Sequence, residues 1–206
     1  MEFPKPCLET FRINGPVRIV VTLFGRISTL NCNSEEFFMP AAATTTLDLS
    51  ESILQSFAVN EKVNQLLLKN VSPGAWRAEP LGKTGRAIAE IFAHIHNVRL
   101  MWLKAAAPDA PQPDKLERLT CTPSEVSTAL AESAQACSSL IRLALATPGG
   151  RVKNFKPDAV HFTAYLMSHE AHHRGQITQP ARQAGYPLPK QTGFAMWEWG
   201  TLAKTP

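Results

Sequence analysis

The chain has 206 residues, a length that suits one domain with a hydrophobic core plus an appendage better than two domains. Its net charge is +4, from 21 basic and 17 acidic residues that are scattered along the sequence. The sequence has no basic cluster interleaved with aromatic residues, and no N-terminal stretch resembles a membrane span or a signal peptide. We therefore expect neither nucleic acid nor a membrane among the partners.

Four cysteines, Cys7, Cys32, Cys121 and Cys137, occur without any CxxC spacing. This pattern is typical of free thiols in a reducing compartment, and it does not fit a disulfide framework or a zinc knuckle. The expected location is the cytoplasm.

Residues 1–44 are expected to be an N-terminal extension of residues 45–206, which form the main domain. In the extension, Gly15-Pro16 is a turn signal, and residues 17–24 are rich in β-forming side chains with no evident strand to pair with. One interpretation is that translation starts at Met39, so that residues 1–38 are a mis-assigned or poorly ordered start. The alternative is a short hairpin docked on the domain.

Two amphipathic helices are predicted first. One begins near Ser50 and is stopped by Ser72-Pro73-Gly74, and the other covers residues 84–104. The candidate inner residues of the first are Ile53, Leu54, Phe57, Ala58, Leu66 and Leu67. The seam of the second contains Ile88, Ile91, Ile95, Val98 and Trp102, at steps of three and four.

Two further helices follow a loop rich in Pro and Asp. Thr122 and Glu125 form a capping box for the third helix, and Asp158 caps a fourth that reaches Gln179 or beyond. Pro180 should kink this helix or end it near Gln176. The inner residues of the third helix are Val126, Leu130, Ala134, Cys137, Ile141 and Ala144. The sequence thus predicts an all-α four-helix bundle, with the aromatic tail at residues 193–200 covering one end.

The most informative segment is HEAHHRGQ, residues 169–176, on the fourth predicted helix. His169 and His173 are four residues apart and therefore lie one turn apart on the same face. Two imidazoles in this arrangement can bind one divalent metal ion, and a third ligand from another helix would leave an open coordination position. His94 and His96 are the candidates for that ligand, and periodicity alone barely separates them.

Residues 91–103 (IFAHIHNVRLMWL), together with the HEAHHRGQ segment, resemble the DinB/YfiT-like metalloprotein family over about residues 45–200. The resemblance implies a four-helix bundle, often a homodimer, that holds a divalent metal ion. The implied ligands are His94, eight positions before Trp102 as in the family pattern, together with His169 and His173. Pro180 departs from the family pattern and puts the helix beyond it in doubt, and residues 1–38 have no counterpart in the family.

Three neutral imidazoles would leave the metal ion its full charge, so a bound thiol or water would become nucleophilic near neutral pH. The resemblance implies a thiol-dependent S-transferase or isomerase whose partners are a small-molecule substrate and a low-molecular-weight thiol. Zn, Ni, Mn and Fe all remain candidates for the metal ion. Gln176 is expected to bind a metal-bound water, and Glu170 to orient a ligand imidazole.

Two alternatives remain open from the sequence. Residues 169–173 also satisfy HExxH, a zinc peptidase signature in which Glu170 would be the general base. A metal ion could instead only stabilise the bundle of a non-catalytic binding module. Among the neighbouring residues, Arg174 is expected to be exposed or to contact another subunit, Gly175 to allow close approach of a helix, and Asn97 to line the site or to form an interhelical hydrogen bond.

Overall fold

The computed structural model describes residues 19–23, 26–30, 46–79 and 85–205 of the chain. The chain divides into two compact units, Met1–Thr45 and Thr46–Pro206. Each unit is described by itself below. The predicted turn at Gly15-Pro16 and two of the cysteines, Cys7 and Cys32, lie outside the described residues.

The first unit contains a two-stranded antiparallel sheet. Strand β1 (Ile19–Leu23) pairs with β2 (Arg26–Leu30), so that Ile19 faces Leu30 and Leu23 faces Arg26. The expectation that β1 has no strand to pair with is therefore wrong, and the hairpin alternative is correct about the pairing. Arg26, Ser28 and Thr29 give β2 a weak apolar pattern, so the sequence does not mark it as a strand, although a spacing of two residues is the commonest between the strands of a hairpin.

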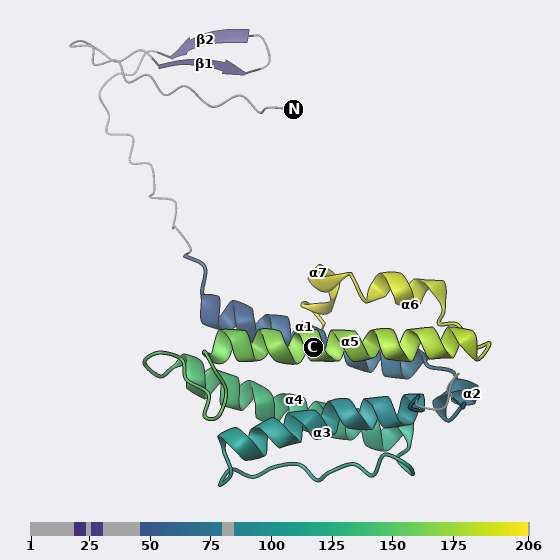
Figure 1. Ribbon diagram of the computed structural model, residues 1–206. Coiled ribbons are helices and arrows are strands. Elements are labelled where there is room, and N and C mark those ends of the chain that lie inside the picture. Colours follow the sequence, from purple (N-terminus) through teal and green to yellow (C-terminus); the bar gives the residue numbers. More distant parts are fainter. Residues whose placement is uncertain (1–18, 24–25, 31–45, 80–84, 206) are drawn as a thin grey trace. The chain divides into compact units, whose positions relative to one another are not determined.

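The second unit is built on four long helices: α1 (Leu49–Asn70), α3 (Ile88–Ala106), α4 (Pro123–Leu145) and α5 (Ala159–Gln183) (Figure 1). They confirm the predicted all-α four-helix bundle. α1 runs parallel to α5, α3 runs parallel to α4, and the two pairs run in opposite directions. The order of the contacts shows these directions. Between α1 and α5 they are Asn60–Glu170 and Asn64–Arg174, and between α3 and α4 they are His96–Ala129 and Arg99–Ser133. Between α3 and α5 the order is reversed, with His94–His173 followed by Trp102–Phe162.

Because α3 and α4 are parallel, the segment between them must return along the length of α3. We call this segment, residues 107–122, the strap, and Figure 1 shows it running beside α3. The Asn97 side chain holds the strap by donating to the Leu116 carbonyl oxygen at 3.0 Å and accepting from its amide at 3.1 Å. A ring nitrogen of His96 lies 2.9 Å from the carbonyl oxygen of Asp114. The strap therefore has a defined path next to the N-terminal half of α3.

The helix ends follow the capping residues of the sequence. The side chains of Thr122 and Glu125 each accept a backbone N–H from the other residue, as a capping box requires, and Asp158 accepts from the backbone N–H of His161. Ser72 was expected only to stop a helix, yet it also caps the short helix α2 (Pro73–Trp76). The predicted start of the second helix, at Thr84, lies outside the described residues, and α3 begins at Ile88.

Helix α5 extends beyond Gln179 as predicted, and of the two effects expected from Pro180 the early end near Gln176 is wrong. The helix runs through Pro180 to Gln183. Ile177 and Ala181, on either side of the proline, are buried and pack in the core, which holds the last turn in place. The helix ends where Gly185 adopts a positive φ of 85° and the amide of Tyr186 donates to the Ala181 carbonyl oxygen, a glycine stop that needs no proline.

The core consists of two clusters of buried apolar residues along the bundle. All six inner residues predicted for α4 are buried, and on α3 Ile88, Ile91 and Ile95 are buried. The predicted face of α1 is partly wrong: Ala58 is exposed, whereas Val59 and Val63 are buried. None of the helices in the described part of the chain is both long and apolar enough to span a lipid bilayer.

The C-terminal tail forms helices α6 (Lys190–Ala195) and α7 (Trp199–Leu202), which contact α1. Figure 1 shows them alongside the bundle near α1 and α5. Phe194 is 62% exposed and Trp197 is 82% exposed. The expectation that these aromatic residues cover one end of the bundle is therefore wrong.

Candidate three-histidine metal centre

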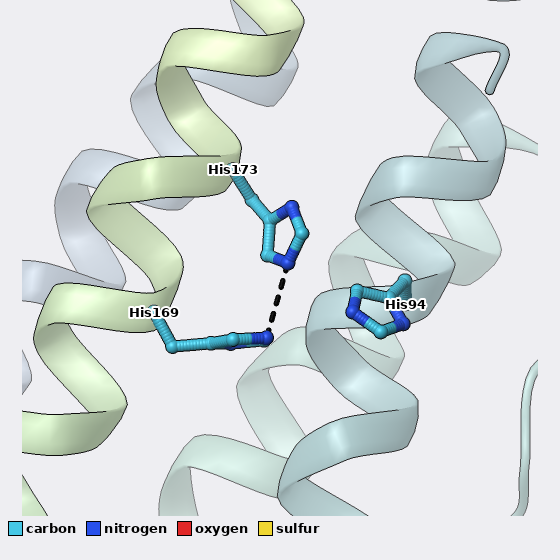
Figure 2. A group of neighbouring side chains, drawn as sticks. All are labelled: His94, His169 and His173. Carbon is cyan, nitrogen blue, oxygen red and sulfur yellow. Dashed lines mark hydrogen bonds between the residues drawn. The ribbon is translucent and has the colours of Figure 1, made fainter. Parts of the chain in front are cut away.

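His169 and His173 project from consecutive turns of α5 toward α3 (Figure 2). Their Nε2 atoms lie 3.0 Å apart, and their ring centroids are 4.4 Å apart. The helix itself produces this proximity, because residues i and i+4 lie above one another on one face. The pair is thus the part of the site that local sequence dictates.

His94 approaches the pair from α3 (Figure 2). The centroid of its ring lies 5.4 Å from that of His169 and 4.6 Å from that of His173, and each ring offers a ligand nitrogen within 4.8 Å of the others. His96 is fully buried elsewhere, with its ring nitrogens 2.8 and 2.9 Å from the carbonyl oxygens of Ala129 and Asp114. The structure thus places His94, and not His96, beside the pair.

The geometry of the cluster fits a divalent ion. Two nitrogens bound to one tetrahedral ion at about 2.0–2.1 Å stand roughly 3.3 Å from each other. The separation of 3.0 Å between the two α5 nitrogens is close to this value, and the third nitrogen lies within 4.8 Å. The three side chains of the cluster can therefore hold a metal ion from one side.

Burial makes the three imidazoles good ligands. Burial lowers the pKa of His94 to about 4, and the neighbouring charges of His173, Arg86 and His169 act in the same direction. Burial also lowers the pKa of His169 and of His173. All three rings are therefore neutral near pH 7, and a neutral imidazole has the lone pair that a metal ion requires.

Gln176 lies one turn beyond His173 and contacts the site through it. Its Oε1 accepts from Nδ1 of His173 at 2.8 Å, and its Nε2 donates to Nε2 of His172 at 2.9 Å. With its proton on Nδ1, His173 presents the lone pair of Nε2 toward His169. The side chain expected to bind a metal-bound water is thus placed where it selects the tautomer of a ligand.

Glu170 points away from the three imidazoles. Its carboxylate accepts from Nε and Nη2 of Arg99 at 2.7 and 2.8 Å, and from the side-chain amides of Asn60 and Asn64 at 2.6 Å each. The hydrogen bond expected from Glu170 to a ligand imidazole is not formed. A general base must reach the water it activates, so this placement does not support the HExxH peptidase alternative.

The buried polar network around Arg99 was missed in the sequence. Arg99 is fully buried and bonds to all three neighbouring long helices: to Glu61 on α1 at 2.8 Å, to Glu170 on α5, and to Ser133 and the Leu130 carbonyl on α4. Burial works against its charge, yet the two carboxylates raise the pKa of Arg99. One signal was present, because Arg99 follows buried Ile95 by four residues and so shares its inner face.

The structure also bears on the expectations for three residues near the site, Arg174, Gly175 and Asn97. Arg174 is partly buried and donates to the side-chain oxygens of Asn60 and Asn64 at 2.9 and 2.8 Å, so the expectation that its charge is exposed is wrong, whereas contact with another subunit stays a prediction. Apart from its chain neighbours and the adjacent backbone of α5, no atom in the described part of the chain comes within 4 Å of where a side chain at Gly175 would begin, so a close helix approach is not observed there. Asn97 holds the strap and not another helix.

An aromatic wall adjoins His169. The Tyr165 ring stacks on the His169 ring with centroids 6.1 Å apart, and it also packs edge-on against Trp102 at 5.6 Å. Phe155 and Phe162 complete this aromatic cluster. Sequence reasoning did not identify Tyr165, although it precedes His169 by four residues and the same one-turn rule applies to it.

Comparison with known proteins gave one informative result. The family model described as "DinB family" matches residues 39–201, which covers the described helices of the second unit up to α7. No curated protein and no solved structure matches the chain. The match extends over most of the chain and includes all three histidines of the cluster. The chain belongs to the DinB family.

Proposed function

We propose that the protein is a metal-dependent S-transferase, in which His94, His169 and His173 hold a divalent ion that activates a small thiol. The observation that carries this proposal is the convergence of three neutral imidazoles from two helices, with no fourth His, Cys, Asp or Glu joining the cluster within the described residues. Three protein ligands with an open position are typical of catalytic sites, whereas structural sites are usually closed by four.

The bound ion would lower the pKa of a thiol at its remaining position and so supply a thiolate at neutral pH. The side chains of the protein would hold the ion, orient the ligand imidazoles and border the site. His169 and His173 form one side of the site, Gln176 keeps the Nδ1 proton on His173, and Tyr165 forms an aromatic wall beside His169. In the transfer itself the thiol proton passes to solvent, sulfur forms a bond to an electrophilic carbon, and the leaving group departs with its bonding electrons.

The first experiment measures metal content. Purified wild-type protein is expected to carry about one divalent ion per chain, and His94→Ala and His169→Ala variants are expected to lose it, as measured by elemental analysis. His161→Ala is the matched control, because His161 lies on α5 but is exposed at 62% of its side-chain surface. Equal metal content in all four proteins would contradict the assignment of the ligands.

The second experiment measures transfer. Protein loaded with Zn, Mn, Ni or Fe is mixed with glutathione, cysteine or bacillithiol and a chlorinated aromatic electrophile, and loss of free thiol is followed. We expect consumption that depends on the metal and on His169. A protein that binds the ion, melts at a much higher temperature with it and consumes no thiol would instead be a metal-stabilised bundle.

The resemblance also implied a homodimer. We retain the homodimer and the cytoplasmic location as predictions. Light scattering of the purified protein tests the first, and fluorescence imaging of a tagged protein in cells tests the second.

A further inference from the structure

A small basic cavity adjoins His94, and none of the residues of the aromatic wall lines it. Its volume is about 160 Å³, and it is lined by Arg86, Glu90, His94, Asn97, Lys115 and Arg118. Pockets for whole drug-sized ligands measure roughly 300–1,000 Å³, so this cavity fits only one group of a ligand. It opens next to a side chain of the proposed metal centre.

Three cationic side chains and one carboxylate line this cavity. The carboxylate is already engaged: Glu90 accepts the backbone N–H of Ala87 at 3.1 Å, and its other oxygen lies 3.8 Å from Nε of Arg118. Within the part of the chain that the structure describes, neither Arg86 nor Lys115 forms an ion pair with a carboxylate. The cavity therefore has an excess of positive charge, which a concave site concentrates.

The basic residues of the cavity come from two segments of the chain. Arg86 precedes Ala87, the N-cap residue of α3, whereas Lys115 and Arg118 belong to the strap. Asn97 makes two hydrogen bonds to Leu116, the residue next to Lys115, and lines the cavity itself. These two hydrogen bonds anchor the backbone of the strap next to Lys115, while the side chains of Lys115 and Arg118 are exposed to solvent and accessible to an anion.

We propose that this cavity is an anion-binding subsite that holds the carboxylate or phosphate group of a small molecule whose reacting atom lies at the three-histidine centre. The anion can be carried by the thiol or by the electrophile. The inference rests on the proposed function for the reaction that this molecule undergoes, but the binding of an anion can be tested without that reaction.

The first test uses metal-free protein and inorganic phosphate. Titration is followed by the backbone amide NMR signals of residues 115–118. We expect saturable shifts in the wild type and a dissociation constant raised about three- to tenfold in Lys115→Gln and in Arg86→Gln, the loss expected for one charge-assisted contact that is partly exposed to solvent. Lys153→Gln, an exposed lysine between α4 and α5, is the matched control and should bind phosphate as the wild type does.

The second test identifies which molecule carries the anion. The transfer rate of metal-loaded protein is compared between mercaptopropionate and mercaptoethanol as the thiol, and between iodoacetate and iodoacetamide as the electrophile. A preference for the charged member of one pair, lost in Lys115→Gln, assigns the anion to that molecule. If the protein binds phosphate at residues 115–118 and transfers no thiol, the subsite stands and the proposed function fails.

Two results would overturn the subsite. The first is an equal phosphate affinity in the wild type, Lys115→Gln and Arg86→Gln, which would mean general screening of a basic surface. The second is active protein that does not distinguish either charged reagent from its neutral counterpart. Circular dichroism of each variant checks that the exposed substitutions leave the helical fold intact.

Discussion

Two neighbouring side chains on α5 lie in different environments. His169 faces α3 and the candidate metal centre, whereas Glu170 faces the buried Arg99 and the amides of α1. One residue step turns a helix by about 100°, so adjacent side chains cannot share a face. The HExxH pattern is satisfied in the sequence, yet its glutamate belongs to the interior of the bundle and its histidines to the site.

Gln176 sets the tautomer of His173, one of the candidate metal ligands. Because its Oε1 accepts from Nδ1 of His173, replacing it with alanine should free the ring and mix its tautomers. We expect Gln176→Ala to weaken metal binding about 10- to 100-fold, the usual effect of removing a group that orients a ligand. Competition with a coloured chelator measures the affinity.

Gln179→Ala is the matched control for this substitution, because Gln179 is an exposed glutamine on the same helix. It should bind the metal as the wild type does. If Gln176→Ala also retained the wild-type affinity, the hydrogen bond to His173 would have no part in metal binding.

At the scale of helices, the ion pair between Arg99 and Glu170 links α3 to α5 close to the three histidines. Arg99 follows His94 by five residues, about 7.5 Å along the axis, and Glu170 directly follows His169. Both partners are 1% exposed, and although burial opposes ionisation, Arg99 and the amides of Asn64 and Asn60 hold the pKa of Glu170 below its usual value. The pair therefore fixes the register in which His94 meets the α5 histidines.

Replacing Glu170 with Gln leaves the shape of the side chain but removes the charge that compensates Arg99. Breaking a buried pair by removing one partner typically costs about 3–5 kcal/mol of unfolding free energy. We expect a loss of that order in Glu170→Gln, measured by urea denaturation, together with weaker metal binding because the two helices are less well held.

The control for Glu170→Gln removes a carboxylate from an exposed pair. Glu51 and Arg142 lie 3.6 Å apart with side chains 47% and 66% exposed, and such pairs contribute less than about 1 kcal/mol. Equal losses in Glu51→Gln and Glu170→Gln would mean that the buried network does not stabilise the bundle.

At the scale of the whole molecule, the bundle has a core of its own. The buried residues of both apolar clusters run from Leu54 to Ala181, and the partly buried residues packed against them end at Met196. These ranges fall inside the unit Thr46–Pro206. A domain with a complete core is expected to fold by itself.

We therefore expect a chain starting at Thr46 to keep the melting temperature of the full chain to within a few degrees and to bind the same amount of metal. Differential scanning calorimetry and elemental analysis of both chains make the comparison. A large fall in melting temperature would show that residues 1–45 contribute to the stability of the bundle.

Short stretches of the sequence determine much of the secondary structure and part of the candidate site. The buried stripe of α4, the capping box at Thr122 and the one-turn spacing of His169 and His173 each depend on residues within a few positions of one another. The helical backbone converts such spacing directly into a shared face, because its rotation per residue is constant. The bundle and two of the three histidines could therefore be predicted.

Periodicity left the third histidine open, and although the family resemblance implied His94, the physical reason for that choice lies in the tertiary structure. His94 and His96 flank the same seam, and their roles separate only because α3 turns one toward α5 and the other toward α4 and the strap. Asn60 meets Glu170 across 110 positions of sequence. Such partners depend on how whole helices are rotated and aligned in the packed core, and the strap, which has no periodic pattern, takes its path only once that core exists.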